Sequence, residues 1–216
     1  MDWTSILSQL AVGMLTSIQI FFLTLLFSLP LGLLVALGRM SKNFIIKNLI
    51  KFYISIMRGT PLMLQLMVVY FGPYYIFGIS ISHEYRFYAV MIGFILNYSA
   101  YFAEIYRSGI ESMPIGQHEA AKVLGYSRSQ TFMRIILPQV IKRILPSVTN
   151  EVITLIKDTS LAFTIGVTEM FTVAKNISSN YRAVGALIAA GVFYYVFNFL
   201  VAALMEFFER KLNYYR

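Results

Sequence analysis

Long uncharged stretches alternate with short charged segments along the whole chain. A membrane-spanning helix needs about 20 apolar residues, because it rises about 1.5 Å per residue and the hydrocarbon core is about 30 Å thick. The gaps between charges therefore predict an all-α integral membrane protein with five transmembrane helices. The expected spans are residues 12–38, 59–82, 87–108, 140–168 and 183–207.

Two of these spans are irregular. The uncharged stretch from Trp3 to Gly38 is too long for one crossing and short of two, so we expect a brief interfacial segment anchored by Trp3 before residue 12. The fourth span is interrupted by Lys157 and Asp158. This interruption resembles a helix break, with Asp158 or Thr159 capping a new half-helix.

A basic amphipathic helix is predicted over residues 44–57, ahead of the second span. Its polar stripe consists of Lys47, Lys51, Ser55 and Arg58, and the remaining positions are mostly apolar. Such a helix is typical of the surface of a membrane, where it contacts anionic lipid or a neighbouring chain. The sequence Gly59-Thr60-Pro61 would then break it from the span that follows.

Composition excludes several classes of function. The chain is 58% hydrophobic and 13% charged, whereas a soluble domain carries about 25% charge, so a soluble enzyme is excluded. There is no cysteine, and His83 and His118 are too far apart in the sequence to suggest a metal centre. We therefore expect no cofactor and no metal on this chain.

The distribution of basic residues predicts the orientation. Most of the 18 lysines and arginines fall in the loops after the first and third spans and in the C-terminal tail. Cytoplasmic loops carry such an excess, which places the N-terminus outside and the C-terminus inside. The net charge of +8 is thereby explained. Because the charge is dispersed over loops, it gives no support to nucleic-acid binding.

The loop at residues 112–138 is the longest polar stretch and predicts two short helices with a glycine elbow. Proline at a helix start, glycine after a helix end and serine at an N-cap are the signals used. The first helix is expected from Pro114 to Leu124 with Gly125 as its stop, and the second from Ser127, capped with Gln130, to Pro138. The simplest interpretation of such a loop is a connector between spans.

The spacing within this loop resembles a known family. Glu119-Ala120-Ala121, Gly125, Ile135 and Leu137-Pro138 match the EAA loop of permease subunits of bacterial ABC importers at each fixed position. Further stretches look like the polar amino acid uptake branch of that family, and together they cover nearly the whole chain. They are residues 58–62, 103–104, 114–117, 157–161 and 165–167.

The resemblance implies a function and a set of partners. It implies one permease domain, residues 1–216, in the bacterial inner membrane, paired with a second and identical permease chain. Glu119, Ala120, Ala121 and Gly125 would dock into two ATP-binding cassette ATPase subunits, which bind ATP and Mg, and an extracytoplasmic protein would deliver the amino acid. Independently, the sequence contains no G-x-x-x-x-G-K-[ST] phosphate loop, so we expect no enzyme activity on this chain.

Ionisable residues inside the fourth span indicate where a substrate binds. Glu151 and Asp158 are seven positions apart and share one helix face, and carboxylates there suit an ammonium or guanidinium group. We expect Glu151 to receive the positive group and the backbone from Asp158 to Ser160 to receive a carboxylate. The opposite wall is expected to include Asn97, Thr60 and Gln65. The substrate would be arginine, lysine, histidine or glutamine.

Structural alternatives stay open for these residues. In the alternative interpretation, Asp158 pairs with Lys157 or caps a half-helix. Asn97 would then make a helix-packing hydrogen bond, and Thr60 would be an N-cap. Tyr98 and Tyr101 are expected in packing, and Glu104 with Arg107 in a local ion pair. The rival functions are a membrane-embedded enzyme, for which a catalytic pair is missing, and a secondary transporter or channel that works without an ATPase, for which an internal repeat is missing.

Overall fold

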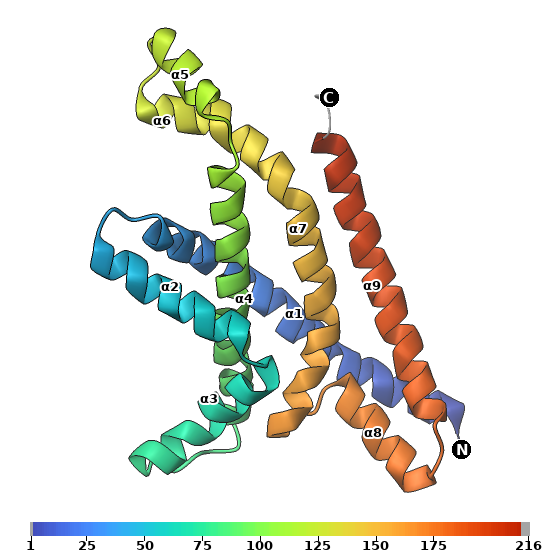
Figure 1. Cartoon of the computed structure of the whole chain (residues 1–216). Helices are drawn as coiled ribbons and strands as arrows, with labels where there is room; N and C mark the ends of the chain where they lie inside the picture. Colours follow the sequence, from blue (N-terminus) through green and yellow to red (C-terminus); the bar gives the residue numbers. More distant parts are fainter. Residues whose placement is uncertain (1, 213–216) are drawn as a thin grey trace.

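A computed structural model describes residues 2–212, and all regular structure in that range is helical (Figure 1). The α-helices are α1 (Trp3–Arg39), α2 (Phe44–Gly59), α3 (Leu62–Phe77), α4 (Tyr85–Glu111), α5 (Ile115–Val123), α6 (Arg128–Thr131), α7 (Leu137–Asp158), α8 (Met170–Tyr181) and α9 (Gly185–Leu212). A π-helix, η1 (Phe132–Ile136), and a 3-10 helix, η2 (Thr159–Ile165), complete the list. The end of the predicted cytoplasmic tail, residues 213–216, lies outside the described residues.

The count of five spans is not confirmed. Within residues 2–212, three helices are long and apolar enough to cross a membrane, namely α1, α4 and α9. A fourth span results if α2 and α3, which meet at 110°, are taken as one broken span. The expected second and fourth spans do form helices, but α3 has only 16 residues and α7 carries several charged side chains.

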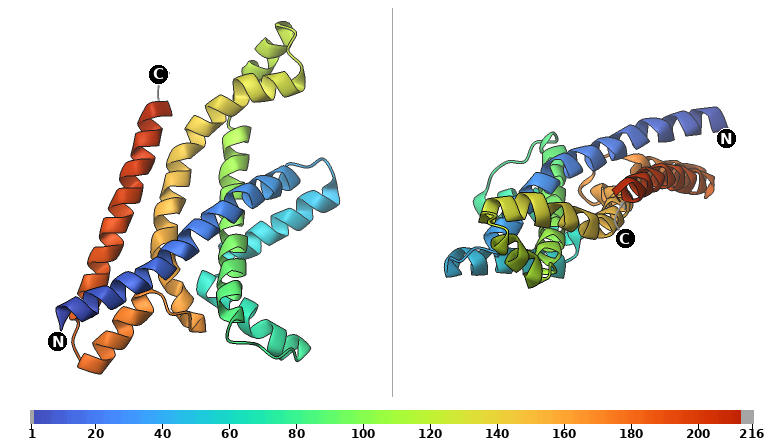
Figure 2. Two further views of the ribbon diagram at one scale, coloured as in Figure 1. Left: turned by 180° about the vertical axis from the view of Figure 1, so that it is seen from behind. Right: turned by 90° about the horizontal axis from the view of Figure 1, so that it is seen from above.

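Helix α1 is a single helix of 37 residues, about 55 Å long, so the segment expected at the interface before residue 12 is continuous with the first span. A helix longer than the hydrocarbon core fits by tilting. Figure 2 shows α1 crossing α4 and α7 obliquely. Glycine allows this close crossing, because a Cβ at Gly32 would lie 2.8 Å from the Cβ of Phe102 on α4.

The predicted amphipathic helix is confirmed as α2. Asn43 caps its start by accepting a hydrogen bond from the backbone N–H of Ile45 at 2.9 Å. Its end follows from Pro61, which has no N–H and forces the preceding Thr60 into an extended conformation. The chain therefore turns sharply at Thr60 before α3 begins.

Within the described range, three apolar clusters hold the helices together, and the smallest joins α1, α2 and α4. The largest one joins α1, α3, α4, α7 and η2, with Phe21, Leu66, Phe94 and Leu155 among its buried side chains. The second one joins α1 to α8 and α9. The sequence predicted no helix at residues 170–181, but α8 forms there and contributes Met170, Ala174 and Ile177 to this cluster. The bend between α2 and α3 lies against the largest cluster, which includes Leu62 and Leu66.

Candidate functional site

A cavity of about 390 Å³ lies where the α2–α3 break, α4, α7 and η2 meet. Its polar lining comes from three places: Thr60 at the break, Asn97, Tyr98 and Tyr101 on α4, and Glu151, Thr154 and Asp158 on α7. The size falls in the range of small-molecule sites, about 300–1,000 Å³. Of the six expected substrate residues, Glu151, Asp158, Asn97 and Thr60 line the cavity, whereas Gln65 and Ser160 do not.

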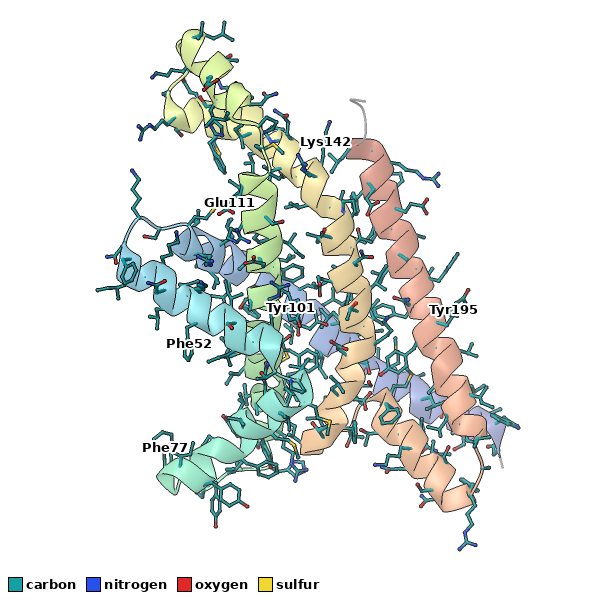
Figure 3. The ribbon with its side chains drawn as sticks, in the orientation of Figure 1. Phe52, Phe77, Tyr101, Glu111, Lys142 and Tyr195 are labelled. Atoms are coloured by element: carbon teal, nitrogen blue, oxygen red, sulfur yellow. The ribbon has the colours of Figure 1, made fainter. Side chains whose placement is uncertain are left out.

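The two carboxylates of α7 that line the cavity differ in their hydrogen-bond partners. The Tyr98 hydroxyl donates a hydrogen bond of 2.7 Å to Asp158 Oδ2, so Asp158 is held by α4 and not by Lys157. Glu151 has no hydrogen bond or ion pair with any residue in the described range 2–212. Arg58 attracts it electrostatically from beside Tyr101, over whose ring the guanidinium lies at 5.3 Å. Figure 3 shows Tyr101 between α4 and α7.

Side-chain amides fix the bend between α2 and α3. Asn97 Nδ2 donates to the Met57 carbonyl and to Gln65 Oε1, both at 3.0 Å. Gln65 Nε2 in turn donates to the Met57 carbonyl at 3.0 Å and to Thr60 Oγ1 at 2.8 Å. The last carbonyls of a helix have no N–H partner within the helix. Here the side-chain amides of Asn97 and Gln65 donate to one of them, the Met57 carbonyl. The packing interpretation of Asn97 is therefore confirmed, and it also lines the cavity.

Two local expectations about caps turn out differently. Thr60 is no N-cap, because it ends α2 and its hydroxyl donates to the Ile56 carbonyl at 2.8 Å. Helix α7 also does not restart at Asp158 or Thr159: it continues directly into η2, and the Thr159 N–H bonds the Leu155 carbonyl. The expected free N–H groups for a substrate carboxylate are thus not available at Thr159. The true break comes at Gly166, whose φ of +76° ends η2.

Sequence reasoning missed Glu169, a fully buried carboxylate just after that break. Its oxygens accept hydrogen bonds from the N–H groups of Phe171 and Thr172, at 2.7 and 2.8 Å, and from the Tyr194 hydroxyl at 3.0 Å. The Ser17 hydroxyl lies 3.4 Å away. Glu169 thereby joins α1, α8 and α9. The available signal was an acidic residue directly before an apolar pattern, which is typical of an N-cap.

We predict that Glu169→Gln destabilises the protein by about 1–3 kcal/mol, because an amide would turn an NH2 group toward donors that need an acceptor. The measurement is thermal unfolding of the purified chain in detergent. Glu206→Gln is the matched control, since Glu206 forms an exposed ion pair with Arg210 that is worth little. Equal melting temperatures for the two variants would contradict the role given to Glu169.

The loop between α4 and α7 projects from one end of the helices (Figure 1). Helix α5 ends as expected, with Gly125 at a φ of +78°, and Ser127 and Gln130 form both hydrogen bonds of the predicted capping box. Val123 is 88% and Leu124 73% exposed at the elbow. An apolar pair held out in this way is typical of a surface that contacts another protein.

The expected end of the second helix at Pro138 is wrong. A π-helical turn, η1, carries α6 directly into α7, and the Leu137 N–H bonds the Phe132 carbonyl. Pro138 then lies directly after the π-helical turn, as the second residue of α7, and the helix passes through it. The loop is therefore continuous with the helix that carries Glu151 and Asp158, and π-turns of this kind are frequent at functional sites.

The expected ion pair at the end of α4 is confirmed. Arg107 Nε donates to both oxygens of Glu104 at 3.1 Å, and its guanidinium also pairs with Glu111. These residues lie outside the cavity lining. They play no part in the candidate site.

Comparison with known proteins identifies relatives over nearly the full length. Residues 28–214 match a family described as the binding-protein-dependent transport system inner membrane component. An L-cystine transport system permease, TcyL of Bacillus subtilis, is 42% identical over 198 residues, covering 90% of this chain and 81% of the relative. The octopine permease OccM of Rhizobium radiobacter is 38% identical over 211 residues, 93% and 86% of the two chains.

Solved structures of ABC transporters contain chains with a similar fold. A chain of an amino acid ABC transporter crystallised with histidines has a TM-score of 0.87 and 33% identity, and the match covers 98% of this chain and 99% of that one. A chain of the MetNI methionine ABC transporter, with a TM-score of 0.69 at 16% identity, shares the fold over 99% of this chain and 100% of its own.

Proposed function

Since the chain belongs to the binding-protein-dependent transport system inner membrane component family and is a permease subunit of an amino acid ABC importer, we propose that it forms half of a pathway for amino acids with a cationic side chain or a polar one. The cavity between the α2–α3 break, α4 and α7 would bind the substrate. The second half would be an identical chain. Function as a secondary transporter or channel is the alternative that the experiment below tests.

The observation that carries this proposal is the carboxylate of Glu151 on the cavity wall, which has no hydrogen bond or ion pair within 4 Å among residues 2–212. An ionisable group in a membrane helix is costly unless it meets a partner or water, so a ligand with an ammonium or guanidinium group would offset that cost. Asp158 adds a second carboxylate, which Tyr98 orients. Arginine, lysine, histidine or glutamine would fit, and relatives are named for octopine, glutamine and cystine.

The carboxylate of the substrate needs a different partner from the one expected from the sequence. Arg58 is the cation beside the cavity, stacked at 5.3 Å over the ring of Tyr101, a lining residue. Guanidinium groups bind carboxylates in a two-pronged geometry. We therefore assign the substrate carboxylate to Arg58.

The partners follow the family. Two ATP-binding cassette ATPase subunits, which bind ATP and Mg, would hold the loop around Glu119, Ala120, Ala121 and Gly125. An extracytoplasmic amino-acid-binding protein would deliver the substrate to the inner-membrane complex. Exposure of Glu119 and Ala120 on α5 supports docking, while Ala121 is buried within the loop. Because η1 continues directly into α7, a movement of the docked loop would be transmitted along that helix to Glu151 and Asp158.

The test is uptake of labelled arginine, histidine and glutamine by vesicles that contain the chain with its ATPase and binding protein. We expect accumulation that requires ATP and the ATPase, with arginine or histidine preferred over glutamine. Accumulation by vesicles with the chain alone would support the secondary transporter instead. If the complete complex hydrolysed ATP but accumulated none of the three amino acids, the substrate assignment would be overturned.

A further inference from the structure

We propose that the ends of α1 and α4 and the first half of α2 form a binding site for the phosphate headgroup of an anionic phospholipid. A cavity of about 640 Å³ lies among these three segments. It is separate from the substrate cavity and shares no lining residue with it. The inference concerns the lipid around the transporter and does not depend on which amino acid is carried.

The cavity is strongly positive. Its charged lining consists of Arg39, Lys47, Lys51, Arg107 and Glu111. Glu111 already pairs with Arg107, which also pairs with Glu104. Among residues 2–212, the side chains of Arg39, Lys47 and Lys51 make no hydrogen bond and no ion pair within 4 Å. The four basic side chains of the lining outnumber its one carboxylate, Glu111, and this excess of positive charge favours an anionic ligand.

The arrangement of α2 favours a lipid over a soluble phosphate. Lys47 and Lys51 lie one turn apart on one face of the helix, whereas Ile45 and Phe52, 73% and 65% exposed, lie on the opposite, apolar side. Figure 3 shows Phe52 and Glu111 on opposite sides of α2. A headgroup bound on the basic side therefore leaves its acyl chains room to run past the apolar side.

The position in the fold fits the membrane surface. Helix α2 runs back beside the last turns of α1, where Ile50 packs near Gly38 and Ile54 packs with Val35 and Ala36, so its basic first half lies beside the end of a membrane helix. Basic pockets between membrane helices bind anionic headgroups, and each Lys or Arg near an anionic surface contributes about 1 kcal/mol. Asn48, which also lines the cavity, offers a neutral amide donor to the phosphate.

Native mass spectrometry of the full chain, stripped of lipid in detergent, tests the proposal. The probes are phosphatidylglycerol, phosphatidylcholine and the soluble headgroup glycerol phosphate. We expect phosphatidylglycerol to bind at least about tenfold more tightly than phosphatidylcholine, and glycerol phosphate to bind far more weakly than either lipid. Equal binding of the two lipids would overturn the charge argument. Glycerol phosphate that binds as tightly as phosphatidylglycerol would overturn the lipid assignment.

Matched variants locate the site. Lys47→Gln with Lys51→Gln should weaken phosphatidylglycerol binding about tenfold or more, and Lys47→Arg with Lys51→Arg should keep it. Arg210→Gln with Lys211→Gln removes the same charge at the end of α9 and should leave binding unchanged. The site is disproved if the two glutamine pairs weaken binding equally or if neither does.

Discussion

Val123→Asp with Leu124→Asp is expected to weaken capture of the ATPase by about 100-fold or more. Each exposed side chain would bury its apolar surface in the partner, and full burial of a side chain of this size stabilises a contact by about 1.5–3 kcal/mol. Aspartate loses that contribution and adds a charge that must be desolvated. The measurement is the amount of ATPase that copurifies with the permease from the membrane.

The control for this variant is Ile79→Asp. Ile79 is also an exposed apolar residue, but it follows α3, far in the sequence from the 112–138 loop. This variant should retain the ATPase. If the double variant captured the ATPase as well as the unchanged chain does, the exposed pair at the elbow would not be the docking surface.

Glu151→Gln should reduce the efficiency of arginine uptake by about 10- to 100-fold. A hydrogen bond to a charged group contributes about 1.5–3 kcal/mol, and the substituted amide keeps the shape of the side chain but loses its charge. We expect a higher KM for arginine, normal assembly with the ATPase and normal ATPase activity without substrate. The measurement is the rate of ATP-dependent uptake against arginine concentration.

A second substrate sharpens this test. If Glu151 binds a cationic side chain, uptake of glutamine should change little in Glu151→Gln, whereas binding of the α-ammonium predicts an equal loss for both substrates. Glu206→Gln, on the exposed face of α9, is the control that makes the same chemical change outside the cavity. Unchanged arginine uptake in Glu151→Gln would remove this residue from the site.

Local patterns in the sequence were sufficient for several elements. The stripe of Lys47 and Lys51 predicted the amphipathic helix α2, and Ser127 with Gln130 predicted a capping box that the structure contains. Gly125 was expected to stop a helix and has a positive φ. These features depend on residues only a few positions apart, so periodicity and capping chemistry determine them without the rest of the fold.

The arrangement of side chains around the cavity could not be predicted from local sequence patterns alone. Spacing placed Glu151 and Asp158 on one helix face. Only the packing of α4 against α7 shows that the Tyr98 hydroxyl bonds Asp158, whereas Glu151 has no such hydrogen bond within the described part of the chain. The expected half-helix through Ile165 is present as η2, but no side chain caps its start, because the Thr159 N–H already bonds the Leu155 carbonyl of α7.

The sequence by itself predicted a helical chain that crosses a membrane and carries a loop resembling the EAA motif, because hydrophobic length and short motifs are properties of neighbouring residues. The tertiary structure decided the 110° angle at the predicted Gly59-Thr60-Pro61 break, the passage of a helix through Pro138, and the burial of Glu169 among three helices. Each of these depends on partners 30 or more positions away or on a change of helical register. No pattern of adjacent side chains encodes such contacts, since they form only when the helices pack.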